Sequence, residues 1–367
     1  MTIDSDIAVV GLGPAGCSAA LAAARGGARV TGFDRKRTPG HPVQCAEFVP
    51  ALLGDDAPVM GACIQSINAM HSYVEDGEAD ARDDFRGRMI DRAAFDAALA
   101  DDAQTAGAVL SFGAQLERVG SDGALHFADG RVARARVIVA ADGPRSPVAT
   151  AIGRADQAIV ETRQVSVRLL RRHNATDIYL SAALPGGYGW LFPKGEVANA
   201  GVGLDPRWRA LLKPALDGLI GRLAAEGRID PEPLGHTGGA IPVGGMRHPS
   251  ARIGDVAVLL AGDACGLANP VTGAGISAAC LSGRMAGEAA ARIASGDAAA
   301  GPEYAEDIDD LFGVALARAV KRRQTILAIH AQGRAPTIGE QRDGWIAYPG
   351  YWQPDSREEI RHDLLEA

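Results

Sequence analysis

The stretch from Ile7 to Asp34 constrains the fold more than any other part of this sequence. It begins with a short apolar run, Ile7–Val10, and continues through a glycine-rich turn into an alanine-rich segment. A second apolar run follows and is closed by Asp34. This order of strand, G-x-G-x-x-G turn, helix, strand and acidic residue is typical of a dinucleotide-binding βαβ unit. The sequence therefore predicts that the chain binds a dinucleotide.

Each glycine of this turn has a separate role in such a unit. Gly11 permits the tight turn, Gly13 lets the backbone approach a pyrophosphate, and Gly16 lets the helix pack closely on the strand. The helix N-terminus then faces the negative charge of the phosphates. Asp34 lies 18 residues after Gly16 and is placed to accept hydrogen bonds from a ribose hydroxyl. The other cofactor-binding residues assigned to this stretch are Pro14, Ala15 and Arg35.

Composition narrows the class of protein. The chain has 367 residues, enough for two domains or one large α/β unit, and 47% of them are hydrophobic. Its formal net charge of −8 argues against general nucleic-acid binding. The five cysteines show no C-x-x-C and no metal-ligand spacing, and the eight histidines show no ligand cluster. We therefore assign no metal and expect a reduced, cytoplasmic protein.

The first residues, MTIDSDIAVV, are expected to enter the first strand directly. They lack the charged region and long apolar stretch of a signal peptide. No apolar run reaches the roughly 18 residues that a membrane span needs. Peripheral contact with a membrane stays open.

The expected strands and helices divide into two interleaved sets. Residues 1–60, 90–150 and 255–300 hold the dinucleotide-binding elements and are expected to form one discontinuous, Rossmann-like domain. Residues 61–89 and 151–254 indicate an inserted, mainly antiparallel sheet for the substrate. Residues 301–367 indicate a C-terminal helical segment and tail. The predicted fold class is therefore α/β.

Two further apolar strands lead into acidic turns. Val137–Ala140 is followed by Asp142, and Val256–Leu260 is followed by Gly262 and Asp263. In an open α/β sheet, ligands bind at the carboxyl ends of the strands, where a carboxylate accepts hydrogen bonds from ribityl or ribose hydroxyls. The alternatives are an ordinary turn at Asp142 and a helix cap at Asp263.

A glycine-rich turn follows Asp263 and opens a helix, whose unpaired N–H groups form a local positive end. Such an end stabilises an anion that forms on a neighbouring ring. The residues that we assign to the cofactor here are Pro270, Thr272, Gly273, Ala274, Gly275 and Ile276.

The three elements, in this order, resemble the FAD-binding pattern of the flavoprotein group typified by p-hydroxybenzoate hydroxylase. The resemblance implies FAD, with the first glycine turn and Asp34 on the AMP half and Asp263 near the ribityl-pyrophosphate. It implies that the Thr272–Gly275 turn lies by the isoalloxazine. It also implies FAD contact for Arg92, whose alternative is a solvated surface residue.

Two segments narrow the group further. Residues 40–47, GHPVQCAE, look like the G-x-P-V-Q-C-G-E stretch of the geranylgeranyl reductase family, and residues 187–194 are similar to its Y-x-W-x-F-P segment. The resemblance implies that Cys45 and Ala46 lie near the flavin. Cys45 is expected either to assist the reaction on an alkene or to be a small buried residue, with Glu47 as its partner. Ala46 departs from the glycine of the family.

Three aromatic residues alternate along the second of these segments. Tyr188, Trp190 and Phe192 are expected to point to one face of a strand. Their rings form an apolar wall with two polar groups, which favours an apolar substrate pocket over an ordinary sheet core.

Two functions fit these residues. The first is an FAD-dependent reductase of carbon–carbon double bonds in an apolar isoprenoid-type substrate, supplied with electrons by NAD(P)H or ferredoxin. The second is an FAD-dependent monooxygenase that hydroxylates an aromatic or apolar substrate through a flavin hydroperoxide. The same cofactor motifs serve both chemistries, so the fold alone does not decide between them. An apolar small molecule or lipid is the expected partner in either case.

Overall fold

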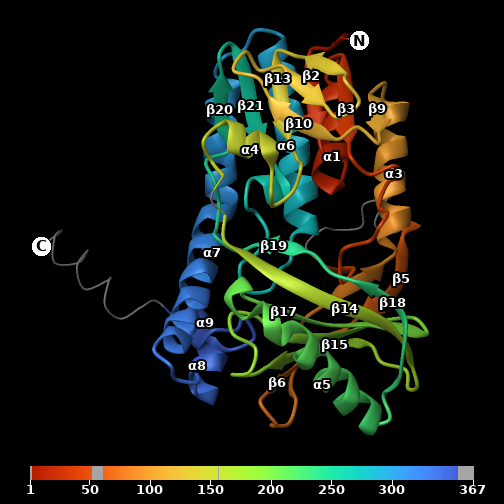
Figure 1. The fold of residues 1–367 in the computed structure, drawn as a ribbon, viewed down its shortest axis with the longest axis vertical. Coiled ribbons are helices and arrows are strands. Elements are labelled where there is room, and N and C mark those ends of the chain that lie inside the picture. The colour runs from red at the N-terminus through yellow and green to blue at the C-terminus, as the bar shows by residue number, and fades with distance from the viewer. Residues whose placement is uncertain (1, 52–60, 156, 354–367) are drawn as a thin grey trace, which may run out of the picture.

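In the computed structural model, residues 2–51, 61–155 and 157–353 are described. They form a mixed α/β fold with one sheet-based unit above another, as Figure 1 shows. The predicted α/β class is confirmed. The domain boundaries remain a prediction, and the tail after residue 353 lies outside the described residues.

The upper unit is built on a six-stranded sheet. Its strands are parallel except for the edge strand β20. In spatial order they are β20 (Ser250–Ile253), β21 (Val256–Leu260), β13 (Val137–Ala140), β2 (Ile7–Val10), β3 (Val30–Asp34) and β9 (Val109–Phe112). Parallel strands are covered on both faces, which is why β2, β13 and β21 are apolar runs without alternation. Distant parts of the sequence thus meet at the carboxyl ends of neighbouring strands.

A smaller sheet accompanies the upper unit. It consists of β1 (Thr2–Asp4), β12 (Val132–Arg134), β11 (Leu125–Phe127) and β10 (Leu116–Val119). The helices of this unit are α1 (Pro14–Arg25), α3 (Arg92–Thr105), α4 (Pro147–Ala151), the 3-10 turn η3 (Gly262–Ala264) and α6 (Ile276–Ala294). Strand β12 therefore pairs in this smaller sheet, whereas β13, which follows it in the sequence, pairs in the six-stranded sheet.

The lower unit contains an eight-stranded, mainly antiparallel sheet. Its strands are β18 (Ile229–Thr237), β14 (Ile159–Leu169), β17 (Val197–Leu204), β16 (Gly189–Lys194), β15 (Ala175–Leu180), β6 (Ala69–Val74) and β7 (Asp80–Arg82), with β19 (Ala240–Pro242) paired to β14. A separate three-stranded sheet holds β4 (Phe48–Pro50), β8 (Gly87–Ile90) and β5 (Cys63–Ile67). Residues 61–89 thus supply two sheets, where the sequence predicted one.

The two faces of the lower sheet differ in what covers them. One face packs on α5 (Leu212–Ala225), which follows the 3-10 helix η2 (Pro206–Leu211), and Leu191 lies in that cluster. Trp190 and Phe192 lie in a separate cluster on the other face, together with Trp345 from the C-terminal segment. The period-two alternation of β16 therefore separates an aliphatic face from an aromatic one.

A long helix connects the two units. Helix α7 (Ala300–Ala331) runs down one side of the molecule to the short helices α8 (Ile338–Asp343) and α9 (Pro349–Trp352), as Figure 1 shows. Near its start, the buried Tyr304 hydroxyl donates a hydrogen bond to the Leu260 carbonyl at 2.7 Å. Near its end, Arg323 reaches Asp205 of the lower unit at 3.4 Å. Among the described residues, no helix is both long and apolar enough to cross a membrane.

The helices α1 and α6 pack with almost no space between their backbones. A Cβ atom built on Gly283 would lie 2.1 Å from the Ala15 carbonyl oxygen, and one on Gly287 would lie 2.3 Å from that of Ala19. Both distances are far below van der Waals contact, so only glycine allows this approach. The packing holds the N-terminal end of α1 in place beneath the first glycine turn.

Replacing Gly283 with alanine is therefore expected to destabilise the protein by ~2–3 kcal/mol, because the added methyl group forces α6 away from α1. The measurement is urea unfolding. Gly218→Ala is the matched control, since Gly218 lies exposed within α5 and its Cβ would meet no atom within 4 Å. That control should gain ~0.5–1 kcal/mol from helix propensity. Equal effects at the two positions would contradict the close packing.

Candidate functional site

The first glycine turn has the geometry that a pyrophosphate site requires. A Cβ on Gly11 would lie 2.3 Å from the Ala141 carbonyl oxygen, and one on Gly16 would lie 1.7 Å from that of Gly11. Gly13, the N-cap of α1, has open space where its Cβ would stand and offers no side-chain cap to the helix. Two glycines thus allow close packing of strand and helix, while the third leaves room beside the uncapped N-terminus.

Asp34, at the end of β3, stabilises this turn. Its carboxylate accepts the Leu12 N–H at 2.6 Å through Oδ2 and the Lys36 N–H at 2.7 Å through Oδ1. Each oxygen keeps a second lone pair for another donor. Pro14 occupies the first turn of α1, Ala15 is buried, and Arg35 is exposed. The contact of Asp34 with a ribose remains a prediction. In the structure, the Asp34 carboxylate fixes the backbone of the glycine turn.

Asp142 lies beyond the end of β13 with one oxygen unused. Its Oδ2 accepts the Val148 N–H at 3.3 Å, while Oδ1 is buried without a partner among the described residues. Burial raises the pKa of this carboxyl to about 6, although hydrogen bonds from Ser146 and Val148 oppose the rise. A buried acceptor of this kind fits a hydroxyl donor from a ligand.

Asp263 lies in the corresponding place after β21. Burial raises its pKa to about 6, and the charge of Arg92 opposes the rise. Within the described chain, no hydrogen bond to its carboxylate accompanies that burial. The preceding Gly262 has a φ of 56° and donates its N–H to the Ser282 hydroxyl at 3.0 Å, which fixes the turn against α6. The carboxylate therefore remains available to a ligand.

The turn before α6 is organised by Asn269. Its side-chain oxygen accepts the N–H groups of Val271 and Thr272 at 2.9 and 3.0 Å. Gly275 is the N-cap of α6 and provides no side-chain cap, so the first N–H groups of that helix stay open. Of the other residues assigned to the cofactor here, Pro270 and Ile276 are buried, Thr272 and Gly273 are half-buried, and Ala274 is exposed.

Arg92 is not a solvated surface residue. It begins α3, and its guanidinium donates to both carboxylate oxygens of Asp96 at 2.9 and 3.0 Å. Only 15% of its side chain is exposed. The same guanidinium lies beside the Cys45 thiol and within electrostatic range of Asp263. Arg92 therefore lies where the cofactor residues meet the Cys45 loop.

Glu47 joins this loop to the lower sheet. Its carboxylate accepts the Arg92 backbone N–H at 3.0 Å, the Lys194 ammonium at 2.8 Å and the Asn199 amide at 3.0 Å. The residue is buried and has a φ of 67°, a left-handed conformation that is uncommon for a side chain of this kind. These three donors engage both carboxylate oxygens, which favours a positioning role.

Cys45 is half-buried and its backbone is held from the lower sheet. Its sulfur accepts the Glu47 N–H at 3.2 Å, and its carbonyl accepts the Gln164 amide at 3.2 Å. The carbonyl of Ala46 accepts the Asn199 amide at 3.2 Å. The loop is thus fixed by side chains from β14 and β17.

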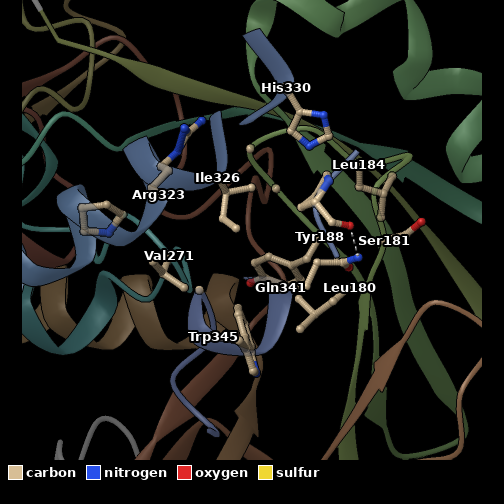
Figure 2. A pocket seen from close by; sticks show the side chains of 15 residues that line it. Leu180, Ser181, Leu184, Tyr188, Val271, Arg323, Ile326, His330, Gln341 and Trp345 are labelled. Atoms are coloured by element: carbon tan, nitrogen blue, oxygen red, sulfur yellow. Dashed lines mark hydrogen bonds between the residues drawn. The ribbon is translucent and has the colours of Figure 1, made fainter. Parts of the chain in front are cut away.

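The three aromatic residues lie on one face, as their alternation predicts. Ring centroids are 5.8 Å apart for Tyr188 and Trp190, and 6.3 Å apart for Trp190 and Phe192. Trp190 donates to the Gln164 side chain at 3.0 Å. A cavity of about 70 Å³ beside them, shown in Figure 2, is lined by Tyr188 but not by Trp190 or Phe192, which are both buried. A pocket role for those two stays a prediction.

The aromatic face is joined to the turn before α6 by a hydrogen bond. The Tyr188 hydroxyl donates a hydrogen bond to the Thr272 carbonyl at 2.5 Å, and burial raises its pKa, so it keeps its proton. Val271 lines the same cavity. The Thr272–Gly275 turn and the aromatic face are therefore neighbours.

Taken together, these residues fit FAD. The open N-termini of α1 and α6 suit a pyrophosphate and an anionic ring, and the unpartnered Asp142 oxygen and the Asp263 carboxylate suit hydroxyl donors.

The sequence analysis did not identify two polar residues of this site. Gln164 of β14 and Asn199 of β17 are buried, and both bind the Cys45 loop. A polar residue in the middle of an apolar run is the signal that would have marked Asn199, because burying an unbonded amide is costly. Strand β14 holds several polar residues and gives no such signal for Gln164. Their partners are 119 and 153 residues away, which sequence spacing does not reveal.

Two histidines also gather around a carboxylate, away from the aromatic face. His71 and His173 approach Asp177 Oδ1 at 3.3 and 2.9 Å, a proximity that the sequence did not show. Arg228 pairs with the other oxygen of Asp177. The pKa of Asp177 is held well below its usual value by these partners, which outweigh its burial. The carboxylate is therefore satisfied by protein groups alone.

Comparison with known proteins gives similarities over most of the chain. The family model described as lycopene cyclase protein matches residues 6–169. Digeranylgeranylglycerophospholipid reductase 2 of Methanosphaera stadtmanae is 31% identical over 361 residues, which cover 89% of this chain and 88% of the relative.

Two solved structures share the fold. A geranylgeranyl bacteriochlorophyll reductase-like protein from Thermoplasma acidophilum matches over the full length of both chains, with a TM-score of 0.75 and 23% identity. PqsL of Pseudomonas aeruginosa, described as a probable FAD-dependent monooxygenase, matches with a TM-score of 0.66 and 17% identity over 89% of this chain and all of its own. The fold is therefore shared by proteins named for different chemistries.

The Asp263→Asn variant is expected to bind FAD about tenfold more weakly, because an amide is a poorer acceptor for a hydroxyl than a carboxylate. The same variant should unfold less readily without FAD. Burial raises the pKa of Asp263 from 3.8 to about 6. The ionised form thus costs stability above about pH 6, and that cost disappears below the unfolded-state pKa.

In FAD-free protein, the variant should therefore gain ~1–2 kcal/mol near pH 8 and nothing near pH 4. Urea unfolding measures the gain, and flavin fluorescence measures the affinity. Asp255→Asn, at an exposed turn, is the control and should change neither quantity. Unchanged affinity for FAD would remove Asp263 from the cofactor site.

The Glu47→Ala variant is expected to lose ~3 kcal/mol of stability, since it leaves the Lys194 ammonium without its buried partner. The double variant Glu47→Ala/Lys194→Met should be more stable than the sum of the two single losses implies, with a coupling of ~1–3 kcal/mol. Urea unfolding of the FAD-loaded proteins measures the cycle. Additive losses would show that the ion pair does not join the loop to the lower sheet.

Proposed function

The chain belongs to the geranylgeranyl reductase family of FAD-dependent oxidoreductases, and on that premise we propose that it reduces carbon–carbon double bonds of an isoprenoid-type lipid. FAD, when bound, supplies the hydride for one alkene carbon. The electrons come from NAD(P)H or ferredoxin in this proposal. Support for the lipid substrate comes from the relative in Methanosphaera stadtmanae, which is named for a digeranylgeranyl glycerophospholipid.

The observation that carries the proposal is the Tyr188–Thr272 hydrogen bond of 2.5 Å. It ties the aromatic face to the turn assigned to the flavin ring. An apolar chain packed along that face would bring a double bond to the cofactor, and proximity of this kind is a large part of catalysis. Trp190 and Phe192 are buried there, and the Trp190 N–H is already hydrogen-bonded, so these side chains exclude water from the reacting carbons.

We assign the proton donor of the reaction to the Cys45 loop. A thiol near the flavin can hold a proton at Sγ and deliver it to the second alkene carbon. The neighbouring Arg92 guanidinium would stabilise the thiolate left behind. Glu47 positions the loop through its three hydrogen bonds and touches neither substrate nor cofactor in this proposal.

The monooxygenase alternative rests on the shared fold with PqsL. Oxygen labelling separates the two functions. The FAD-loaded protein is supplied with geranylgeranyl diphosphate and a reductant under 18O-labelled O₂, and the product is examined by mass spectrometry. A gain of two hydrogens without label is expected. Label in the product would overturn the reductase function.

The Cys45→Ala variant is expected to lower kcat at least tenfold while the protein remains yellow, because the proton donor is lost but the cofactor residues stay. Cys63→Ala is the matched control, since Cys63 is also half-buried but lies in β5. Its turnover should equal that of the wild type. Undiminished turnover in Cys45→Ala would assign Cys45 a packing role.

Peripheral contact with a lipid surface belongs to the same proposal. Helix α7 exposes Leu311 and Val314, and Trp352 of α9 is exposed beneath the Arg318 guanidinium, 5.3 Å from its ring. Two neighbouring basic residues of α7 are held by the protein itself. Arg322 donates to backbone carbonyls of the C-terminal segment, and Arg323 is buried.

A further inference from the structure

The cavity between α7, α8 and the loop before β16 combines apolar walls with buried polar groups. Its apolar lining includes Leu180, Leu184, Val271 and Ile326, which Figure 2 shows around its centre. Its polar lining comes mainly from the C-terminal segment and comprises Ser181, Arg323, His330, Gln341 and Trp345. The proposed function leaves the polar part of this cavity without a role.

Three side chains of this lining have a polar atom without a hydrogen-bond partner among the described residues. These atoms are Nε of Arg323, Oε1 of Gln341 and Nε1 of Trp345. The three residues are only 7%, 7% and 3% exposed. A buried polar group without a partner is costly and rare in native proteins. The occurrence of three around one cavity therefore indicates a polar ligand.

The donors and acceptors among these atoms define that ligand. Arg323 and Trp345 each offer an N–H, so the ligand must carry an acceptor. Gln341 offers an acceptor, because its amide nitrogen already donates to the Glu75 carboxylate at 2.5 Å and to the Pro336 carbonyl at 3.3 Å. The ligand must therefore also carry a hydrogen to donate. A hydroxyl group meets both requirements, since it has two acceptor lone pairs and one hydrogen.

The charges next to the cavity favour a neutral ligand. The Asp205 carboxylate accepts hydrogen bonds from Arg323 at 3.4 Å and from Arg207 at 2.9 Å. The Glu75 carboxylate, which holds the Gln341 amide, brings a second negative charge. Two acidic groups thus offset two guanidinium groups. Burial lowers the pKa of His330, which keeps its ring neutral. These groups leave no net charge to attract an ion.

The size and the walls of the cavity decide what carries the hydroxyl. Its volume of about 70 Å³ is about half of the roughly 150 Å³ that accommodates benzene in a protein core, so it has room for a few non-hydrogen atoms. If the cavity held water alone, its apolar side chains would face that water, whereas the first carbons of an aliphatic alcohol would cover them. The hydroxyl end of a hydrocarbon chain therefore fits both parts of the lining.

We propose that this cavity binds the hydroxyl end of an isoprenoid alcohol, with Gln341 and Trp345 as its specificity-determining residues. The proposal rests on the proposed function, because it names the class of the same isoprenoid substrate. Tyr188 lines the cavity, and its hydroxyl contacts the Thr272 carbonyl of the turn assigned to the flavin ring. The hydrocarbon chain extends from the cavity along the aromatic face. Binding of the hydroxyl thus fixes which double bond lies at the cofactor.

The experiment compares three compounds with the same chain, which are geranylgeraniol, its methyl ether and geranylgeranyl diphosphate. Calorimetric titration into the oxidised, FAD-loaded protein measures binding without turnover, and kcat/KM is measured separately. The wild type should bind the alcohol at least tenfold more tightly than the ether, which has no hydroxyl hydrogen. It should also prefer the alcohol at least tenfold over the diphosphate, which is charged and larger.

The Gln341→Met variant tests the acceptor of the cavity. Without the amide oxygen, the preference for the alcohol over the ether should fall at least fivefold. An unchanged preference would mean that size alone excludes the ether, and it would overturn the proposal. Gln332→Met, at the exposed C-cap of α7, is the matched control and should behave as the wild type does. Differences in solubility among the compounds cancel when each ratio is compared between variant and wild type.

The Trp345→Phe variant keeps the test decisive if Gln341→Met fails to fold. It removes the indole N–H and retains an aromatic ring beside Tyr188. The affinity for the alcohol should fall about fivefold, because one donor to the hydroxyl oxygen is lost, while the flavin content stays the same. Trp352→Phe is the control, since that indole N–H donates to the Ile346 carbonyl at 2.9 Å, and it should keep the wild-type affinity. An unchanged affinity in Trp345→Phe would overturn the role of Trp345.

The outcomes separate this site from the proposed function. Equal affinity of the wild type for the alcohol and the ether would show that water alone satisfies these atoms, and would overturn the proposal. Tighter binding of the diphosphate than of the alcohol would overturn it as well. In both cases the reductase function stands if the compounds are still reduced. If the protein binds the alcohol through Gln341 but reduces none of the compounds, the proposed function fails and the hydroxyl site stands.

Discussion

The bonds to the Glu47 carboxylate are the interaction on which the site depends. They join the start of α3 in the upper unit to β16 and β17 in the lower sheet through one buried acceptor. The loop with Cys45 lies between these partners, so its position is set from both units at once. A buried ion pair of this kind contributes less to total stability than to fixing one arrangement, which is what a site assembled from two units requires.

The cofactor half of the molecule could be predicted because its signals are local. The turn from Gly11 to Gly16 is read from neighbouring residues, and each glycine has a steric reason within the same βαβ unit. Asp142 and Asp263 follow from the rule that ligands bind at strand ends. Their raised pKa values, however, come from the burial of the assembled sheet and could not be read from the sequence.

The substrate half resisted prediction because its contacts are distant in the chain. Glu47 meets Lys194 and Asn199 across 147 and 152 residues, so its positioning role is invisible to spacing. Alternation placed Tyr188, Trp190 and Phe192 on one face but could not separate a cavity wall from a core. Arg323 lies in a segment that the sequence indicated only as helical, and packing of α7 on the lower unit buries it.

The length of α7 has a consequence for how such a protein can change over generations. Its 32 residues span about 48 Å, so one rigid rod is anchored to the end of β21 by Tyr304 and reaches the cavity with Arg323. Insertion or loss of a single residue between these anchors would rotate the far end by about 100° and carry Arg323 out of the cavity. Substitutions at the cavity are free of that constraint. The lining of the cavity should therefore change by exchange of side chains, while the spacing from Tyr304 to Arg323 stays fixed.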